Sequence, residues 1–104
     1  MRESKTIILN LTGCKYLGEL HEKIRIAFDF PEWYGANWDA FWDLLNEPRE
    51  YTVVKVYGLN QLPDDLKSSG KMLVDILQEN KVYYENFMKR QSKFDYRFDY
   101  EIIS

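Results

Sequence analysis

The sequence predicts an α/β fold in which helices cover mainly one face of a three-stranded parallel sheet. Short apolar runs rich in β-branched residues alternate with longer segments whose apolar residues recur at helical spacing. Helical segments separate each strand from the next, and crossovers of this kind join parallel neighbours through right-handed connections. The last strand alternates apolar and polar residues, which indicates that one face of the sheet lies open.

Composition indicates a single globular domain over residues 1–104. The chain is 45% hydrophobic and 30% charged, and its formal net charge of −3 argues against nucleic-acid binding, which usually requires a basic stripe. Cys14 is the single cysteine, so no internal disulfide can form and we expect a reducing, cytoplasmic compartment. The apolar run near the N-terminus is too short for a signal peptide or a membrane span.

The first strand is expected at residues 6–11, an apolar run bounded by Gly13. A helix should follow from Leu17 and end before Pro31, because the residue that precedes a proline avoids the helical region. His21 lies near the apolar side of this helix, so we expect it to be packed and hydrogen-bonded rather than catalytic. That side carries Leu17, Leu20, Ile24, Ala27 and Phe28.

Residues 34–37 are expected to turn the chain into a second helix over residues 38–45. Gly35 can adopt a positive φ, and Asn37 can cap the new helix. The helix should stop before Pro48, which cannot continue it.

The second half of the chain repeats the alternation. Residues 51–57 form a predicted strand closed by Gly58, and residues 62–67 a short helix with Pro63 in its first turn. A longer helix after Gly70 leads to a solvated turn at residues 89–93. One side of this helix carries Met72, Leu73, Ile76, Leu77, Tyr83, Tyr84 and Phe87, of which the last three are predicted to be core. The final strand alternates Tyr96, Phe98, Tyr100 and Ile102 on one face with Arg97, Asp99 and Glu101 on the other.

The stretch over residues 30–45 is both aromatic and acidic. It holds all 3 tryptophans, and no Lys or Arg occurs between Arg25 and Arg49. The same interval contains Asp29, Glu32, Asp39, Asp43 and Glu47. Ordinary surfaces mix their charges, so this composition is typical of a surface that meets a basic partner.

The helix over residues 38–45 has two contrasting sides when its residues are placed about 100° apart. One sector holds Ala40, Phe41, Leu44 and Leu45, which is enough apolar surface to dock a short helix. The opposite sector holds Trp38, Asp39, Trp42, Asp43 and Asn46. The two indoles either widen the buried stripe or belong to an exposed contact surface, and the sequence leaves both interpretations open.

Asp39 and Asp43 stand four residues apart and are therefore neighbours on the helix surface. Like charges at this spacing cost about 0.2–0.5 kcal/mol, and no nearby basic residue compensates. The pair could form a solvated acidic face, a contact surface for a basic partner or, with Glu32, a Mg²⁺ site. One histidine and one cysteine leave nothing from which to build a zinc site or a nucleophile–base pair.

Residues 30–45 read Phe-Pro-Glu-Trp-Tyr-Gly-Ala-Asn-Trp-Asp-Ala-Phe-Trp-Asp-Leu-Leu. Together with Leu20 and His21, they closely resemble the barstar family, intracellular inhibitors of the ribonuclease barnase. The family pattern is Leu-Pro-x-Tyr-Tyr-Gly-x-Asn-x-Asp-Ala-Leu-Trp-Asp-x-Leu. Trp33 departs from it by replacing a tyrosine, and Trp38, at the open position before the first aspartate, replaces a leucine. The resemblance extends to the order of elements and implies a small barstar-like fold.

In that family the turn and the helix plug the active site of the ribonuclease. The resemblance implies that Asp43 stands in for a substrate phosphate, that Asp39 engages the same basic cleft and that Trp33 matches a tyrosine of the turn. It also implies a role for an acid on the last helix, matched here by Glu79. The implied partner-binding residues are Trp33, Gly35, Asn37, Trp38, Asp39, Trp42, Asp43, Asn46 and Glu79.

The resemblance therefore implies an inhibitor and not an enzyme. We expect a protein that is monomeric when free and binds a small, basic, barnase-like ribonuclease 1:1, with no catalytic residue, metal, cofactor, nucleic acid or membrane involved. One alternative is a binding or immunity module of the same fold for another basic protein or toxin. Another is a small Mg²⁺-dependent enzyme that uses Asp39 and Asp43.

Overall fold

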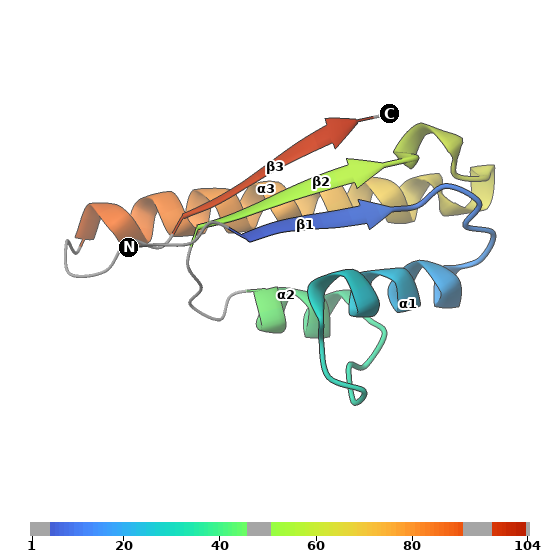
Figure 1. Cartoon of the computed structure of the whole chain (residues 1–104), viewed down its shortest axis with the longest axis horizontal. Coiled ribbons are helices and arrows are strands. Elements are labelled where there is room, and N and C mark those ends of the chain that lie inside the picture. The colour runs from blue at the N-terminus through green and yellow to red at the C-terminus, as the bar shows by residue number, and fades with distance from the viewer. Residues whose placement is uncertain (1–4, 46–50, 91–96, 104) are drawn as a thin grey trace.

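The computed structural model describes residues 5–45, 51–90 and 97–103 (Figure 1). In chain order the elements are β1 (Lys5–Asn10), α1 (Leu17–Phe28), α2 (Trp38–Leu45), β2 (Thr52–Tyr57), the 3₁₀ turns η1 (Leu59–Gln61) and η2 (Asp64–Leu66), α3 (Lys67–Arg90) and β3 (Phe98–Ile103). This order of strands and helices confirms the predicted α/β fold.

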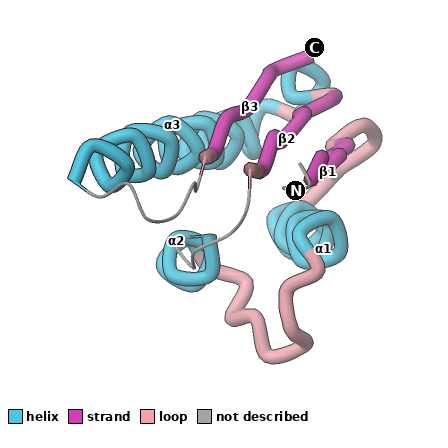
Figure 2. The backbone as a smooth tube through the Cα atoms, turned by 60° about the vertical axis from the view of Figure 1, so that its left-hand side comes forward, coloured by secondary structure: helices cyan, strands magenta, loops and turns pink. Residues whose placement is uncertain are grey.

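The strands form one parallel sheet in the order β1-β2-β3. Ile7 of β1 is in register with Val54 of β2, which in turn is in register with Tyr100 of β3. Both crossovers step in the same direction along the sheet, and Figure 2 shows their helices on the same side of it. The two connections consequently have the same hand.

Burial alternates along the strands and confirms that the helices cover one face. Ile7 and Leu9 are buried, whereas Ile8 between them leaves 50% of its surface exposed. On the central strand, Val54 and Val56 are fully buried. The core therefore lies between one face of the sheet and the three helices, and the opposite face is open (Figure 2).

The connection from β2 to β3 differs from the sequence prediction. The short helix predicted at residues 62–67 and the longer one after Gly70 are wrong as separate elements, because η2 runs directly into α3 and Gly70 lies inside α3. Gly70 is buried, and an added Cβ would lie 2.8 Å from a methyl group of Leu62. Glycine here permits close packing and does not break the helix. Lys89 and Arg90 form the last turn of α3 and not the predicted solvated turn, whose remaining residues lie outside the described ranges.

The apolar side of α3 is narrower than the sequence suggests. Met72 and Tyr83 each expose 45% of their surface, so the prediction that Tyr83 is core is wrong. Asn80 takes a core position instead and is fully buried, with no hydrogen-bond partner for its side-chain amide in the described part of the chain. The buried residues of α3 are Gly70, Leu73, Ile76, Leu77, Asn80 and Tyr84.

The alternation predicted for the last strand holds at its start and is lost toward its end. Phe98 is buried, whereas Ile102 exposes 38% of its surface. Tyr96, predicted to share their face, lies outside the described residues. In residues 5–45, 51–90 and 97–103, no helix is long and apolar enough to cross a membrane.

Adjacent isoleucines of β1 provide a direct test of the one-sided sheet. Ile7→Ala should lower the free energy of unfolding by about 2–5 kcal/mol, because it leaves a cavity under the helices. Ile8→Ala removes the same atoms from the open face and should cost less than about 1 kcal/mol. Urea denaturation of both variants measures the difference. Equal costs would mean that both faces of the sheet are covered.

Candidate functional site

Asn37 determines where α2 begins. Its side-chain Oδ1 accepts a hydrogen bond of 2.8 Å from the backbone N–H of Ala40, and its Nδ2 donates one of 3.0 Å to the carbonyl of Gly35. The first of these bonds satisfies a helix N–H that has no partner within the helix. The predicted cap is therefore confirmed, and it fixes the orientation of the residues that follow it on α2.

The turn before α2 contains a left-handed residue, but not the predicted one. Ala36 has a φ of 51°, whereas Gly35 does not have a positive φ. For a residue with a Cβ this conformation costs roughly 1–2 kcal/mol. The need for glycine at position 35 is spatial, because an added Cβ would lie 2.8 Å from Nδ2 of Asn37. The Asn37 side chain can therefore hold its capping position only because Gly35 has no side chain.

A cluster of the buried His21 and Tyr34 with the half-buried Trp38 anchors this turn to α1. His21 is only 2% exposed, its Nδ1 lies 2.8 Å from the hydroxyl of Tyr34, and its ring centroid lies 4.6 Å from that of Trp38. The Tyr34 hydroxyl also donates a longer bond of 3.4 Å to the carbonyl of Asn37. Both bonds form together when Nδ1 of His21 carries the proton. Burial lowers the pKa of His21 and raises that of Tyr34, so both groups are neutral at neutral pH. His21 is packed and hydrogen-bonded, as the sequence predicts.

The outward side of α2 carries two unpaired carboxylates. Asp39 and Asp43 are exposed, and within the described part of the chain neither makes an ion pair or a side-chain hydrogen bond. The nearest preceding base, Arg25, is bound to Glu22 on α1 at 2.6 Å. No Lys or Arg occurs between Arg25 and Arg49, so the segment that forms α2 and its preceding turn supplies no positive charge of its own.

The three tryptophans occupy different environments. Trp33, in the turn, exposes 74% of its surface. Trp38 and Trp42 are half-buried and pack against the core, whose α2 contribution is Phe41, Leu44 and Leu45. Both interpretations left open by the sequence are therefore partly right, because each indole adds to the buried stripe and still borders the acidic side.

α3 contributes to the same region through Tyr83. Its ring centroid lies 6.5 Å from that of Trp42, in an edge-to-face arrangement at 73°. Sequence reasoning missed Tyr83 by grouping it with Tyr84, although adjacent helical residues point about 100° apart. Glu79 is exposed and lies one turn before Tyr83, on the flank of α3 that faces α2. Because Glu79 stands four residues before Tyr83, the two are neighbours on one side of the helix, and this spacing could have assigned Tyr83 to the candidate surface.

Three features remain to be considered, namely Asn46, the Mg²⁺ alternative and Cys14. Asn46 lies outside the described residues. Among residues 5–45, 51–90 and 97–103, no three His, Cys, Asp or Glu side chains come together to hold a metal ion, which gives the Mg²⁺ alternative no third protein ligand. Cys14 is buried, and burial raises the pKa of its thiol, which disfavours the reactive thiolate.

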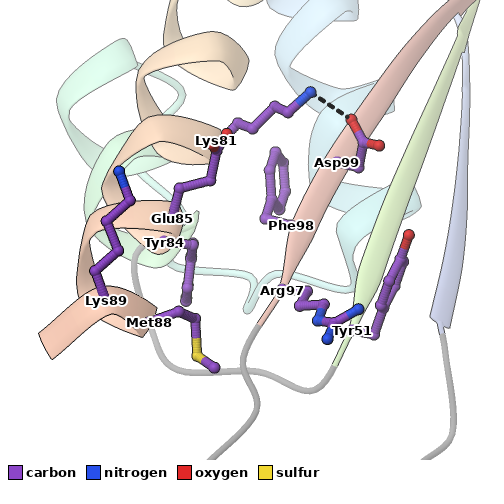
Figure 3. A pocket seen from close by; sticks show the side chains of 9 residues that line it. All are labelled: Tyr51, Lys81, Tyr84, Glu85, Met88, Lys89, Arg97, Phe98 and Asp99. Carbon is purple, nitrogen blue, oxygen red and sulfur yellow. Dashed lines mark ion pairs between the residues drawn. The ribbon is translucent and has the colours of Figure 1, made fainter. Parts of the chain in front are cut away.

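A separate pocket of about 430 Å³ opens on the other flank of α3, beside the start of β3 (Figure 3). Its lining mixes the positive charges of Lys81, Lys89 and Arg97 with the carboxylates of Glu85 and Asp99. Lys81 is bound to Asp99 at 3.1 Å, an ion pair that ties α3 to β3. Neither Asp39 nor Asp43 lines it, and it is not part of the acidic surface of α2.

Comparison with protein families gives a match over nearly the whole chain. A family model described as Barstar (barnase inhibitor) matches residues 4–101 of the 104-residue chain. The matched range includes the capped turn, α2 and the flank of α3 that carries Glu79 and Tyr83.

Burial of His21 predicts a specific loss of stability in acid. In the unfolded chain the imidazole has its ordinary pKa of 6.5, whereas in the folded protein that pKa is lower. The unfolded state therefore binds a proton first, and the stability that His21 contributes is complete above pH 6.5 and falls as the pH drops below it.

The measurement is urea denaturation of the wild type and His21→Gln between about pH 7.5 and pH 5. Because glutamine does not titrate, the free energy of unfolding of the wild type should fall relative to that of the variant over this range. Parallel pH curves for the two proteins would contradict the expectation.

Proposed function

Because the chain belongs to the barstar family, we propose that it inhibits a small, basic ribonuclease by placing the acidic side of α2 in the phosphate-binding site of the enzyme. The observation that carries this proposal is the pair Asp39 and Asp43. Both are exposed, they lie one turn apart on a capped helix, and no ion pair neutralises them in the described part of the chain. Two carboxylates without a positive partner inside the protein are complementary to cationic side chains on a binding partner.

The chemistry of ribonucleases explains how such a pair inhibits. These enzymes position cationic side chains to hold the phosphates of RNA and to stabilise the charge of the transition state. Carboxylates at i and i+4 have Cβ atoms about 5–6 Å apart, so two of them can occupy neighbouring cationic positions. A carboxylate cannot be cleaved there, and the enzyme remains blocked.

The turn before α2 reduces the entropy lost on binding. Asn37 caps the helix, and the bond between His21 and Tyr34 holds the turn against α1. Groups that are already ordered lose little freedom when a partner docks. Trp33 is the one large aromatic residue that the described part of this turn leaves mostly exposed, and it is suited to enter an apolar recess of the partner.

The same surface also suits another basic protein, such as a toxin of unrelated activity. Both functions use Asp39 and Asp43, and only the effect on RNA cleavage separates them. The monomeric state of the free protein and the 1:1 complex belong to this proposal.

Inhibition of a barnase-like ribonuclease is the first expected result. Titration of the protein into a fluorogenic RNA-cleavage assay should abolish activity, with an end point at one inhibitor per enzyme. Absence of inhibition at micromolar concentration, across a panel of small basic ribonucleases, would disprove the ribonuclease proposal and leave the fold unaffected.

Substitutions of the acidic pair should separate binding from folding. Asp43→Ala and Asp39→Ala should each weaken binding, Asp43→Ala more strongly, by about 2–5 kcal/mol, because cations of the partner are left buried and unpaired. Asp65→Ala, in η2 before α3, is the control and should bind as the wild type does.

Neither change on α2 should destabilise the free protein, because each one relieves a like-charge pair. Calorimetric titration and thermal melts of the three variants measure both effects. Equal losses of affinity in all three would locate the binding surface elsewhere.

A further inference from the structure

We propose that Tyr83 of α3 is an aromatic contact residue of the surface that carries Asp39 and Asp43, so that the partner presents an apolar patch beside its cationic cleft. This inference rests on the proposed function and adds a chemical requirement to the partner. It concerns one exposed ring, the two aromatic side chains that hold it and the acid one turn away.

Tyr83 is held in place by two other rings. Its ring meets Trp42 of α2 at 6.5 Å and 73°, and Tyr84 of its own helix at 5.5 Å and 88°. Tyr84 is buried and stacks on Phe98 of β3 at 6.3 Å and 18° (Figure 3). A row of aromatic rings thus runs from β3 through α3 to α2, and Tyr83 is its exposed member.

The exposed part of Tyr83 is suited to recognition. The side chain leaves 45% of its surface exposed, and its hydroxyl has no hydrogen-bond partner within the described residues. A tyrosine fixed by its neighbours presents a large contact area at a small cost in conformational entropy. Its ring offers an apolar face, and its free hydroxyl can both donate and accept a hydrogen bond.

The two flanks of α3 differ in how their polar groups are used. On the flank toward β3, Lys81 pairs with Asp99 at 3.1 Å, and Gln78 accepts a bond of 2.7 Å from the hydroxyl of Tyr100. On the flank toward α2, Glu79 is exposed and has no ion pair in the described ranges. These two polar side chains on the first flank bind partners within the fold. On the second flank, the carboxylate of Glu79 adds to the negative charge of Asp39 and Asp43.

This combination identifies the chemistry of the partner. Carboxylates beside an exposed aromatic ring repel the phosphates of a nucleic acid and favour a basic protein. Packed helices lie about 8–10 Å apart, so a partner whose cationic cleft receives α2 must present its apolar patch roughly that far from the cleft. The basic ribonuclease of the proposed function is the occupant to which this geometry points.

Val82 provides a matched control for the test. It exposes 44% of its surface, almost the same as Tyr83, but points about 100° away around α3. Tyr83→Ala should raise the Kd for the inhibited ribonuclease about tenfold or more, whereas Val82→Ala should change it by less than about twofold. Calorimetric titration measures both, with denaturant melts to show that each variant is folded.

Tyr83→Lys keeps the result decisive if the alanine variant does not fold. Lysine four residues after Glu79 forms a favourable helical pair that supports α3, while its charge repels a basic partner. This variant should also bind more weakly by about tenfold or more. If Tyr83→Ala, or Tyr83→Lys in its place, matches Val82→Ala while the wild type still inhibits, the contact through Tyr83 is wrong and the proposed function stands. If the wild type inhibits no ribonuclease, both the proposed function and the proposed role of Tyr83 are wrong.

Discussion

The sheet has one covered face, and this constraint determines where every helix of the fold must lie. Ile7, Leu9, Val54 and Val56 point to the same side, so α1, α2 and α3 all have to bury their apolar stripes there. A helix as short as α2 can contribute only Phe41, Leu44 and Leu45 to that core, and its opposite side must face outward. The exposure of Asp39 and Asp43 is thus a consequence of how the sheet is covered.

Elements with a clear period were predictable from the sequence, whereas the backbone at Gly70 and at Ala36 was not. Burial with period two in β1 and β2, and the apolar stripe of α1, needed only local pattern. Gly70 was misread because glycine usually weakens a helix, whereas here a close approach of Leu62 requires it. Ala36 was missed for the complementary reason. It has a positive φ in the turn that Asn37 closes through its bonds to Gly35 and Ala40, and alanine is not a residue type that indicates a left-handed conformation.

The same distinction applies to the candidate site. Helical spacing predicted the outward direction of Asp39 and Asp43, and the residue type of Asn37 predicted the cap. It could not place Tyr83, because that position depends on how α2 and α3 pack together, a tertiary contact between residues far apart in the sequence. The match to the barstar family supports an inhibitor of this type in general. The aromatic row from Phe98 to Trp42 follows from side-chain contacts between α2, α3 and β3.

The register of the sheet has a kinetic consequence. Ile7 pairs with Val54, and Val54 with Tyr100, so each strand pair joins segments separated by nearly half of the chain. No pair can close as a local hairpin, and contacts of such long range form slowly compared with the helices. Until the strands pair, the sheet face against which α2 packs does not exist. We therefore expect the chain to acquire its acidic surface late in folding, so that partly folded molecules lack the fixed geometry that tight binding requires.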